Sequence, residues 1–376
     1  MSKEDLYQQR LERIRKAVRF EPVDKIPVAP CANAYWARQQ GVLVADYVKD
    51  FELACTTNIE AMEALGGVDA TQNVIFCPYL PANDWLSEVA VPGDPGVDPN
   101  GVWQIMEAEL MKPEDYQVIL DKGFGAFYQD YCENRLNHHM TKLKPFFDYL
   151  PTAARRMKEA GIPCICDFLM ITPFEYFCGG RSLETFFTED LMDEPELMDQ
   201  VFAKTYEYKV AEYGAMMDAT HPLGVWVGGW RSNPAMISPA IFDRFVWPYM
   251  KGYAQLCLDK GVIPIFHLDA NWDNQIHRFL ELPAKSCIMA LDSATNIRRA
   301  REILGDHMCI LGDVPPQLLA FGKPEEVREY VHGLCRDIGP TGYIVASGCD
   351  IPTNARPENV KAMCDAANSY LAGQAK

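Results

Sequence analysis

Three side chains of the sequence could together hold one metal ion. His267 and Asp269 are separated by one residue in the apolar run VIPIFHLD, and residues two apart on a strand project to the same side. Cys349 follows another apolar run, YIVAS. An imidazole, a carboxylate and a thiolate with an open fourth position would suit catalytic zinc. The spacing alone leaves another interpretation open: a hydrogen-bonded strand histidine, a loop-capping aspartate and one of thirteen cysteines. Cys309 is a reserve ligand, for which core packing is the simpler interpretation.

Apolar runs that alternate with helical segments must position these residues. Helices between successive strands require parallel pairing, because a crossover joins parallel neighbours. Eight such units, with no GxGxxG after the first strand, predict an α/β fold of the (β/α)8 TIM barrel class. The eight strands are expected at about 26–30, 71–76, 163–170, 224–230, 262–269, 286–292, 308–314 and 343–350.

The pattern predicts a single domain over residues 1–376, with two additions to the barrel. Residues 1–25 are expected to form an N-terminal helical extension. Two strand-like runs flank the turn sequence PGDPGVDPNG, which predicts a β-hairpin insertion at about 84–111 over one mouth of the barrel. Longer helices are expected at about 44–65, 182–219 and 238–259.

Polar residues follow the expected strands at their carboxyl ends, where the loops of a parallel barrel form its functional face. They are Asp167, Trp230, Arg231, His267, Asp269, Asp292, Asp313, Cys349 and Asp350. Aromatic residues are dense in the same segments, as a flat apolar substrate would require, although core packing of a large barrel would account for many of them. The expected substrate-binding residues are Tyr35, Trp36, Asp167, Phe168, Trp230, Trp272 and Asp313.

Composition excludes several functional classes. A net charge of −17 argues against a nucleic-acid binder that works by counterion release. A content of 48% hydrophobic and 11% aromatic residues excludes a disordered acidic protein. The charged N-terminus and the lack of an apolar run near about 18 residues predict neither a secretory signal nor a membrane partner. We therefore expect a soluble cytoplasmic protein with reduced cysteines.

Several segments are similar to the uroporphyrinogen decarboxylase superfamily, whose fold is a TIM barrel. RKAVRFEPVDKIPVAP resembles its opening, and IFHLDANW, ILGDVPPQLLAFGKPEEV and YIVASGCDIPTNARPENVKAM resemble its cobalamin-linked methyltransferase branch. True decarboxylases carry RQAGRY after the first strand and a catalytic Asp past the second. This chain has CANAYWARQQG and NVIFCPY there, with Cys77 near the position of the acid. Porphyrinogen decarboxylation is therefore not expected.

The methyltransferase branch carries a zinc motif, His-x-Cys with a distant Cys. The resemblance implies zinc at His267, Asp269 and Cys349, which would act in catalysis through the metal, with Asp269 in place of the middle thiolate. Oxygen in place of sulfur gives a harder metal, better suited to an ether oxygen as leaving group. We therefore expect an O-demethylase methyltransferase that moves a methyl group from an aryl methyl ether to Co(I), with the cobalamin carried by a separate corrinoid protein.

Two alternatives remain at this stage. One is a methylcobalamin:thiol methyltransferase of the coenzyme M type, which runs the transfer in the opposite direction. The other is a non-catalytic barrel that binds a corrinoid or another tetrapyrrole without chemistry.

Overall fold

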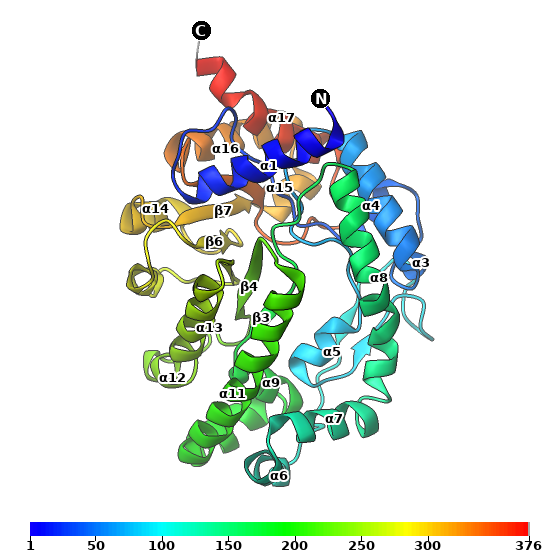
Figure 1. Cartoon of the computed structure of the whole chain (residues 1–376), viewed down its shortest axis with the longest axis vertical. Helices are drawn as coiled ribbons and strands as arrows, with labels where there is room; N and C mark the ends of the chain where they lie inside the picture. The colour runs from blue at the N-terminus through cyan, green and yellow to red at the C-terminus, as the bar shows by residue number, and fades with distance from the viewer. Residues whose placement is uncertain (375–376) are drawn as a thin grey trace.

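Six parallel strands form most of a barrel in the computed structural model, which describes residues 1–374 (Figure 1). Each strand pairs with the next one along the chain. The strands are β3 (Leu169–Ile171), β4 (Gly224–Gly229), β5 (Ile263–Leu268), β6 (Ile288–Leu291), β7 (Cys309–Val314) and β8 (Tyr343–Ser347). The expected α/β TIM barrel class is confirmed.

Two short extended segments close the ring between β8 and β3. Val28 pairs in parallel with Val345 of β8, and Thr71 pairs in parallel with Cys164, upstream of β3. The two segments are joined because the backbone N–H of Ala70 donates to the carbonyl of Val28 (3.2 Å). The expected strands at 26–30 and 71–76 are thus single bridges. Prolines 27 and 30 explain this for the first segment, since proline has no N–H to donate to a ladder.

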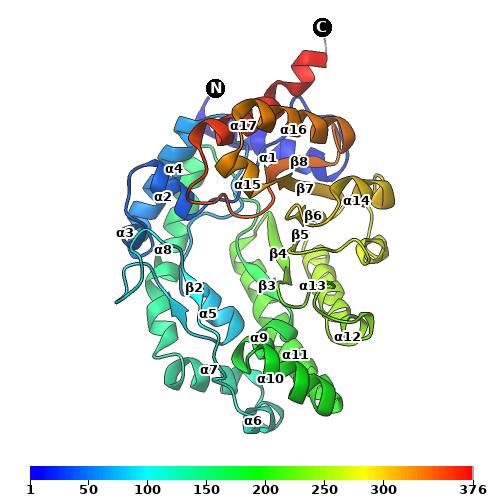
Figure 2. The same ribbon diagram turned by 180° about the vertical axis from the view of Figure 1, so that it is seen from behind.

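Helices surround the barrel on its outer side (Figures 1 and 2). Near both termini, α1, α16 and α17 lie together, and α4 packs against α8 on another wall. The α-helices before β4 are α1 (Lys3–Val18), α2 (Ala34–Gln39), α3 (Val44–Tyr47), α4 (Phe51–Leu65), α5 (Leu80–Trp85), α6 (Glu114–Lys122), α7 (Phe124–Asn134), α8 (His139–Glu159), α9 (Pro173–Gly180), α10 (Leu183–Thr185) and α11 (Pro195–Thr220). Those after β4 are α12 (Pro239–Phe245), α13 (Trp247–Asp259), α14 (Ile297–Leu304), α15 (Pro316–Phe321), α16 (Pro324–Asp337) and α17 (Pro357–Gln374).

The three longer helices expected from the sequence are each interrupted. Between α3 and α4, the side chain of Asp50 accepts from the N–H of Leu53 (2.9 Å) and so begins a new helix. The region 182–219 contains a π-helical turn, Phe186–Leu191, before α11 begins at Pro195. A break at Val246 separates α12 from α13, which has a proline in its first turn. Proline favours the first turn of a helix and disfavours its interior.

An antiparallel pair of very short strands lies within residues 84–111. Val89 of β1 (Val89–Ala90) is paired with Ile105 of β2 (Gln104–Ile105). The chain after β2 is tied to the loop that follows β4, because Arg231 Nη2 lies 2.5 Å from Glu107 Oε2. The division of the chain into one domain with an insertion stays a prediction.

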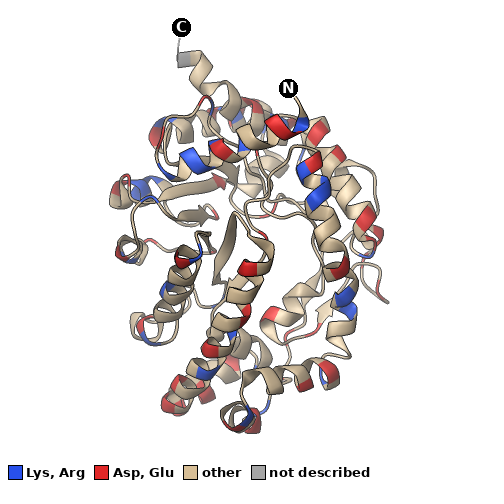
Figure 3. Cartoon of the chain, viewed as in Figure 1, with Lys and Arg blue, Asp and Glu red and all other residues tan. Residues whose placement is uncertain are grey.

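Alternate strand residues form two separate cores. Inside the barrel lie Ile265, Ile288, Ala290, Cys309, Leu311, Ile344 and Ala346. Their neighbours along the strands, such as Phe266 and Val345, pack against the helices. Three residues of α1, Ile14, Ala17 and Val18, join the inner core and close the amino end of the barrel. Among the residues of β3 to β8, Asp313 is the one Asp, Glu, Lys or Arg, and Figure 3 shows charge gathered on the helices.

A buried ion pair fastens α1 to the barrel. Asp69 is fully buried, and its carboxylate accepts from Arg13 Nη1 (2.6 Å) and from the backbone N–H of Val28 (3.0 Å). Lys25 Nζ is 3.0 Å from the same carboxylate. Asp69 therefore joins the helix that plugs the barrel to the segment that closes it. No helix in the described part of the chain is long and apolar enough to cross a membrane.

We predict that Asp69→Asn lowers the free energy of unfolding by about 2 kcal/mol, because Arg13 and Lys25 lose a buried charged partner and Arg13 keeps only its ion pair with Asp24. Urea denaturation followed by circular dichroism measures the change. The matched control is Asp148→Asn, which removes an exposed ion pair with Lys144 and should cost less than about 0.5 kcal/mol. Equal losses in the two variants would contradict the anchoring role of Asp69.

Candidate metal centre

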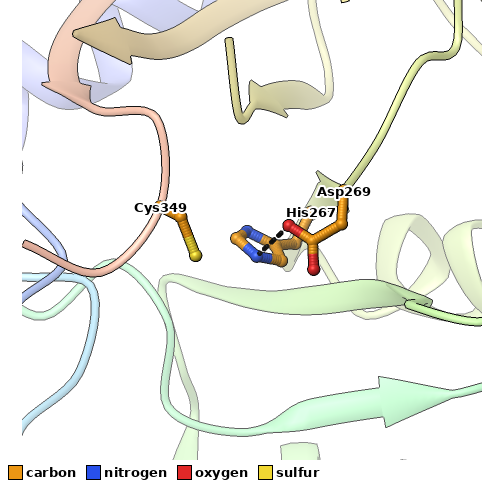
Figure 4. A group of neighbouring side chains, drawn as sticks. All are labelled: His267, Asp269 and Cys349. Atoms are coloured by element: carbon orange, nitrogen blue, oxygen red, sulfur yellow. Dashed lines mark ion pairs between the residues drawn. The ribbon is translucent and has the colours of Figure 1, made fainter. Parts of the chain in front are cut away.

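The fold brings His267, Asp269 and Cys349 together at the carboxyl end of the barrel (Figure 4). His267 lies near the end of β5, Asp269 follows that strand, and Cys349 lies in the loop after β8. One donor atom from each residue lies within 4.8 Å of the other two, and His267 Nε2 is 3.3 Å from Asp269 Oδ1. Ligand atoms about 2.0–2.3 Å from a tetrahedral zinc stand roughly 3.3–3.8 Å apart. The donor types therefore suit zinc, and the spacing of His267 and Asp269 falls in this range.

The neighbouring strand fixes the imidazole of His267. Its ring stacks on the indole of Trp226, with centroids 4.2 Å apart and an interplanar angle of 7°. Gly228 is paired with His267 across the β4–β5 ladder. A Cβ at Gly228 would lie 3.0 Å from the His267 carbonyl oxygen, so a side chain there would crowd the ladder. The stacking therefore fixes the plane of the imidazole ring.

Asp292, at the end of β6, organises the loops that carry the other two donors. Its carboxylate accepts from the backbone N–H of Ala270 (2.7 Å), which follows Asp269. A Cβ at Gly348 would lie 2.7 Å from the Asp292 carbonyl, so glycine allows the loop carrying Cys349 to pass close to β6. The N–H of Gly348 also donates to Val314 (2.9 Å). These backbone contacts bring the thiol to the same side of the mouth as His267.

The neighbours of His267 favour the protonated form of its imidazole. Burial lowers the pKa of the imidazole, but hydrogen bonds to Asp269 and Cys349 outweigh that effect and raise the pKa to about 10. A metal ion bound by the same atoms would displace that proton. The Nδ1 atom of His267 is buried and has no partner among the described residues, and the same is true of Trp226 Nε1 and Thr172 Oγ1. Buried polar atoms normally have a partner, so these atoms indicate space for water or a ligand.

Two further carboxyl groups of the mouth have raised pKa values. Burial raises the pKa of Asp350 to about 6, although its carboxylate accepts from the backbone N–H of Asn33 (3.1 Å). Burial also raises the pKa of Asp313 to about 7, while the hydroxyl of Tyr330 donates to it (3.0 Å). Tyr330 belongs to α16, so the carboxylate of Asp313 contacts the helices around the barrel. Protonated and ionised forms of Asp313 are therefore both accessible near neutral pH.

The expected positions of Asp167 and Phe168 are wrong. β3 ends at Ile171, and its register pairs Leu169 with Trp226, so Asp167 lies beside Gly224 at the amino end of β4. Phe168 stacks on Tyr213 of α11, with centroids 6.1 Å apart. Pairing with β4 places β3 at Leu169–Ile171, which follows Asp167 and Phe168 in the sequence. These two residues therefore precede the strand and do not lie at its carboxyl end.

Tyr35, Trp36 and Trp272 pack as core residues. Tyr35 and Trp36 are almost fully buried in α2, with ring centroids 5.3 Å apart. Trp272 is fully buried, and its Nε1 donates to the carbonyl of Asp269 (2.7 Å). Trp272 therefore supports the loop that carries Asp269, and the packing interpretation left open by the sequence describes all three residues.

Cys309 lies too far toward the amino end of the barrel to share the site. It begins β7 and pairs with Ile288, whereas His267 pairs with Ala290, two residues further along β6. Its side chain is buried in the inner core, where burial raises the pKa of the thiol to about 12. The structure does not bring the reserve ligand to the other donors.

Trp230 lies at the mouth as expected, with its ring centroid 6.4 Å from that of His267. It also contacts Trp85 of α5, at a centroid distance of 4.5 Å. The fully buried carboxylate of Glu175 accepts from Trp85 Nε1 (2.9 Å) and from the backbone N–H groups of Arg231 (3.0 Å) and Ser232 (2.8 Å). Glu175 therefore holds Trp85 against the loop after β4.

Sequence reasoning missed Trp226, Trp85 and Glu175. Trp226 could have been found, because it shares the inward face of β4 with Gly228, which pairs with His267 on the next strand. Trp85 and Glu175 meet across 90 residues of sequence, and no local pattern signals that contact.

Comparisons with known proteins agree with the fold. A uroporphyrinogen decarboxylase of Myxococcus xanthus is 23% identical over 367 residues, which cover 96% of each chain. One of Citrifermentans bemidjiense is 30% identical over 171 residues, and in that match the chain spans about half the length of its relative, 47%. A methyltransferase from Methanosarcina mazei has a similar structure, with a TM-score of 0.72, 16% identity and coverage of 96% of this chain and 99% of that one.

A protein-family model matches the second half of the chain. The model described as uroporphyrinogen decarboxylase (URO-D) matches residues 170–370, which contain β4 to β8 and all three donor residues. Because this match spans more than half of the 376 residues, the protein belongs to the uroporphyrinogen decarboxylase family.

Proposed function

We propose that the protein is a zinc-dependent methyltransferase that moves a methyl group from an aryl methyl ether to Co(I) of a separate corrinoid protein. The grouping of His267, Asp269 and Cys349 carries the proposal. The structural likeness to a protein named as a methyltransferase supports it.

The donor set favours an oxygen leaving group. His267, Asp269 and Cys349 would hold the zinc, which supplies a Lewis acid at the mouth when bound. One thiolate with a carboxylate and an imidazole leaves a more electrophilic metal than two thiolates do. An ether oxygen gains more from such a site than a thiol does, because a thiol substrate must itself become a strong nucleophile.

In this proposal, the aromatic wall orients the substrate. Trp226, Trp230 and Trp85 are within one or two ring contacts of His267, and stacked or tilted rings suit a flat aryl group. The partnerless Trp226 Nε1 and Thr172 Oγ1 give a polar substituent of the ring something to bind, at a place where an apolar group would leave them unpaired.

The transfer forms one bond and breaks one bond. The electron pair of Co(I) forms the new cobalt–carbon bond, and the pair of the broken carbon–oxygen bond leaves with the phenolic oxygen. That oxygen then takes up a proton from water, because the pKa of a phenol, about 10, lies above neutral pH. The products are a phenol and methyl-Co(III) on the corrinoid protein.

The ligand set has a direct test in zinc content. We predict that the purified full chain retains about one zinc ion, and that Cys349→Ser weakens zinc retention at least about tenfold, as loss of metal-site contacts does. Cys309→Ser, a buried thiol of the inner core, is the matched control and should keep wild-type zinc. Elemental analysis after graded chelator treatment measures both. Equal loss from the two variants would show that the ligand set is wrong.

The reaction itself is tested by mixing the protein with reduced corrinoid protein and a methoxyphenol. We predict that the absorbance of methyl-Co(III) appears and that one phenol is formed per methyl group transferred. Both signals should be lost in His267→Ala. Methylation of a thiol from methylcobalamin, with no transfer from any aryl ether, would replace this proposal with the thiol methyltransferase. Binding of corrinoid without either transfer would favour the non-catalytic barrel.

The protonation of Asp313 has a signature in stability. Because burial raises its folded pKa from 3.8 to about 7, folding takes up a proton between these values, and stability falls as pH rises through that window. We predict that Asp313→Asn removes up to about 1.4 kcal/mol of this decline per pH unit, measured by urea denaturation from pH 4 to pH 8. Tyr330→Phe removes a donor to the carboxylate, so the decline should extend to higher pH. An unchanged profile in Asp313→Asn would contradict a raised pKa for this carboxyl group.

A further inference from the structure

A cavity lies at the opposite end of the barrel from His267. It has a volume of about 340 Å³ and opens between α1 and the amino ends of β4, β5 and β6. Ile263, the first residue of β5, lines it, and His267 is four residues further along the same strand, about 13 Å away. The cavity therefore shares no residue with the candidate metal centre.

The charge of this cavity is opposite to that of the protein as a whole. Arg15, Arg19, His221 and Lys285 line it, and none of its lining residues is acidic, although the chain carries a net charge of −17. Burial, followed by the charge of Asp167, raises the pKa of Tyr7 on this side of the barrel, but Asp167 does not line the cavity. The cavity is a cationic site on an acidic protein.

Two of the three Arg and Lys side chains have their charges available. Among the described residues, Arg15 and Lys285 form no side-chain hydrogen bond and no ion pair. Lys285 Nζ instead lies 5.7 Å over the ring of Phe20. Arg19 differs, because its Nε and Nη2 atoms donate to Glu21 and Glu12. An incoming anion would therefore meet Arg15 and Lys285 without displacing a carboxylate.

Apart from Tyr7 and Ser286, most of the other side chains that line the cavity are apolar. Leu11 and Val18 of α1 face Leu223 and Ile263 of the barrel across the cavity. A bare inorganic ion would use the cations and leave the half-buried Leu11, Leu223 and Ile263 in contact with water. An anion with an apolar body would cover them as well, and the volume falls in the range of about 300–1,000 Å³ typical of small-molecule sites.

We propose that this cavity binds a small organic anion, with its carboxylate or phosphate group at Arg15 and Lys285 and its apolar body against Leu223 and Ile263. Guanidinium groups match the geometry of both head groups. Because α1 forms one wall and the strand ends form the other, the ligand joins the helix to the barrel. Binding to the native state alone raises its stability, and the gain grows with the logarithm of the free ligand concentration once this exceeds the Kd.

The test is isothermal titration calorimetry of the full chain with three probes of similar size. Phenyl phosphate and 4-phenylbutyrate carry the two head groups, and 4-phenylbutyramide is their neutral match. We expect at least one of the two anions to bind and the amide to bind at least about tenfold more weakly. Inorganic phosphate should also bind at least tenfold more weakly than phenyl phosphate.

Variants then locate the site. Arg15→Ala and Lys285→Ala should each weaken binding about tenfold or more, and both side chains lack the hydrogen bonds whose loss would endanger folding. Lys16→Ala, the next residue of α1 and outside the cavity, should keep wild-type affinity. His267→Ala should also keep it, which separates this site from the mouth. The inference is overturned if neither anion binds, if the amide binds equally well, or if Lys16→Ala or His267→Ala weakens binding as much as Arg15→Ala.

Discussion

The parallel ladder between β4 and β5 is the constraint on which the site depends. It sets Gly228 beside His267 and Trp226 two residues below, so that the indole lies flat against the imidazole. A larger residue at position 228 would crowd the ladder at that point. Closure of the barrel then determines what His267 meets: the bridges at Val28 and Thr71 bring the loop after β8 around to the end of β5. Cys349 reaches the other two donors through the fold, across 82 residues of sequence from His267.

The two ends of the barrel carry side chains of opposite charge. At the carboxyl end, buried carboxyl groups lie around one imidazole and one thiol, and several of them have raised pKa values because they are desolvated. Such groups are costly unless a cation or a proton compensates them. At the amino end, α1 plugs the barrel and leaves a cationic cavity beside its own apolar face. The same helix is held by the buried ion pair of Arg13 and Asp69. Its apolar residues pack into the inner core as well, so two kinds of contact fix its position.

Sequence alone predicts the barrel, and local rules offer its donor group as one of two interpretations, to which the family resemblance adds support. Alternation along a strand places His267 and Asp269 on one side, and the strand-end rule for parallel sheets places Cys349 at the same mouth. Where the outcome depends on tertiary register, sequence reasoning fails. Asp167 was placed at the mouth because its run contains an acid after apolar residues, but pairing with β4 moves the end of β3 to Ile171. Aromatic density is similarly ambiguous: Trp272 and Trp36 are core residues, whereas Trp226 contacts His267.

The central claim is that one thiolate, one imidazole and one carboxylate of this chain hold zinc for methyl transfer from an ether. X-ray absorption at the zinc edge of the purified full chain tests it most directly, because sulfur ligands at about 2.3 Å are distinguished from nitrogen and oxygen ligands at about 2.0–2.2 Å. The account predicts a first shell with one sulfur ligand and the remainder nitrogen and oxygen, and loss of the sulfur contribution in Cys349→Ser. A shell with two or more sulfur ligands, or one with none, would contradict it.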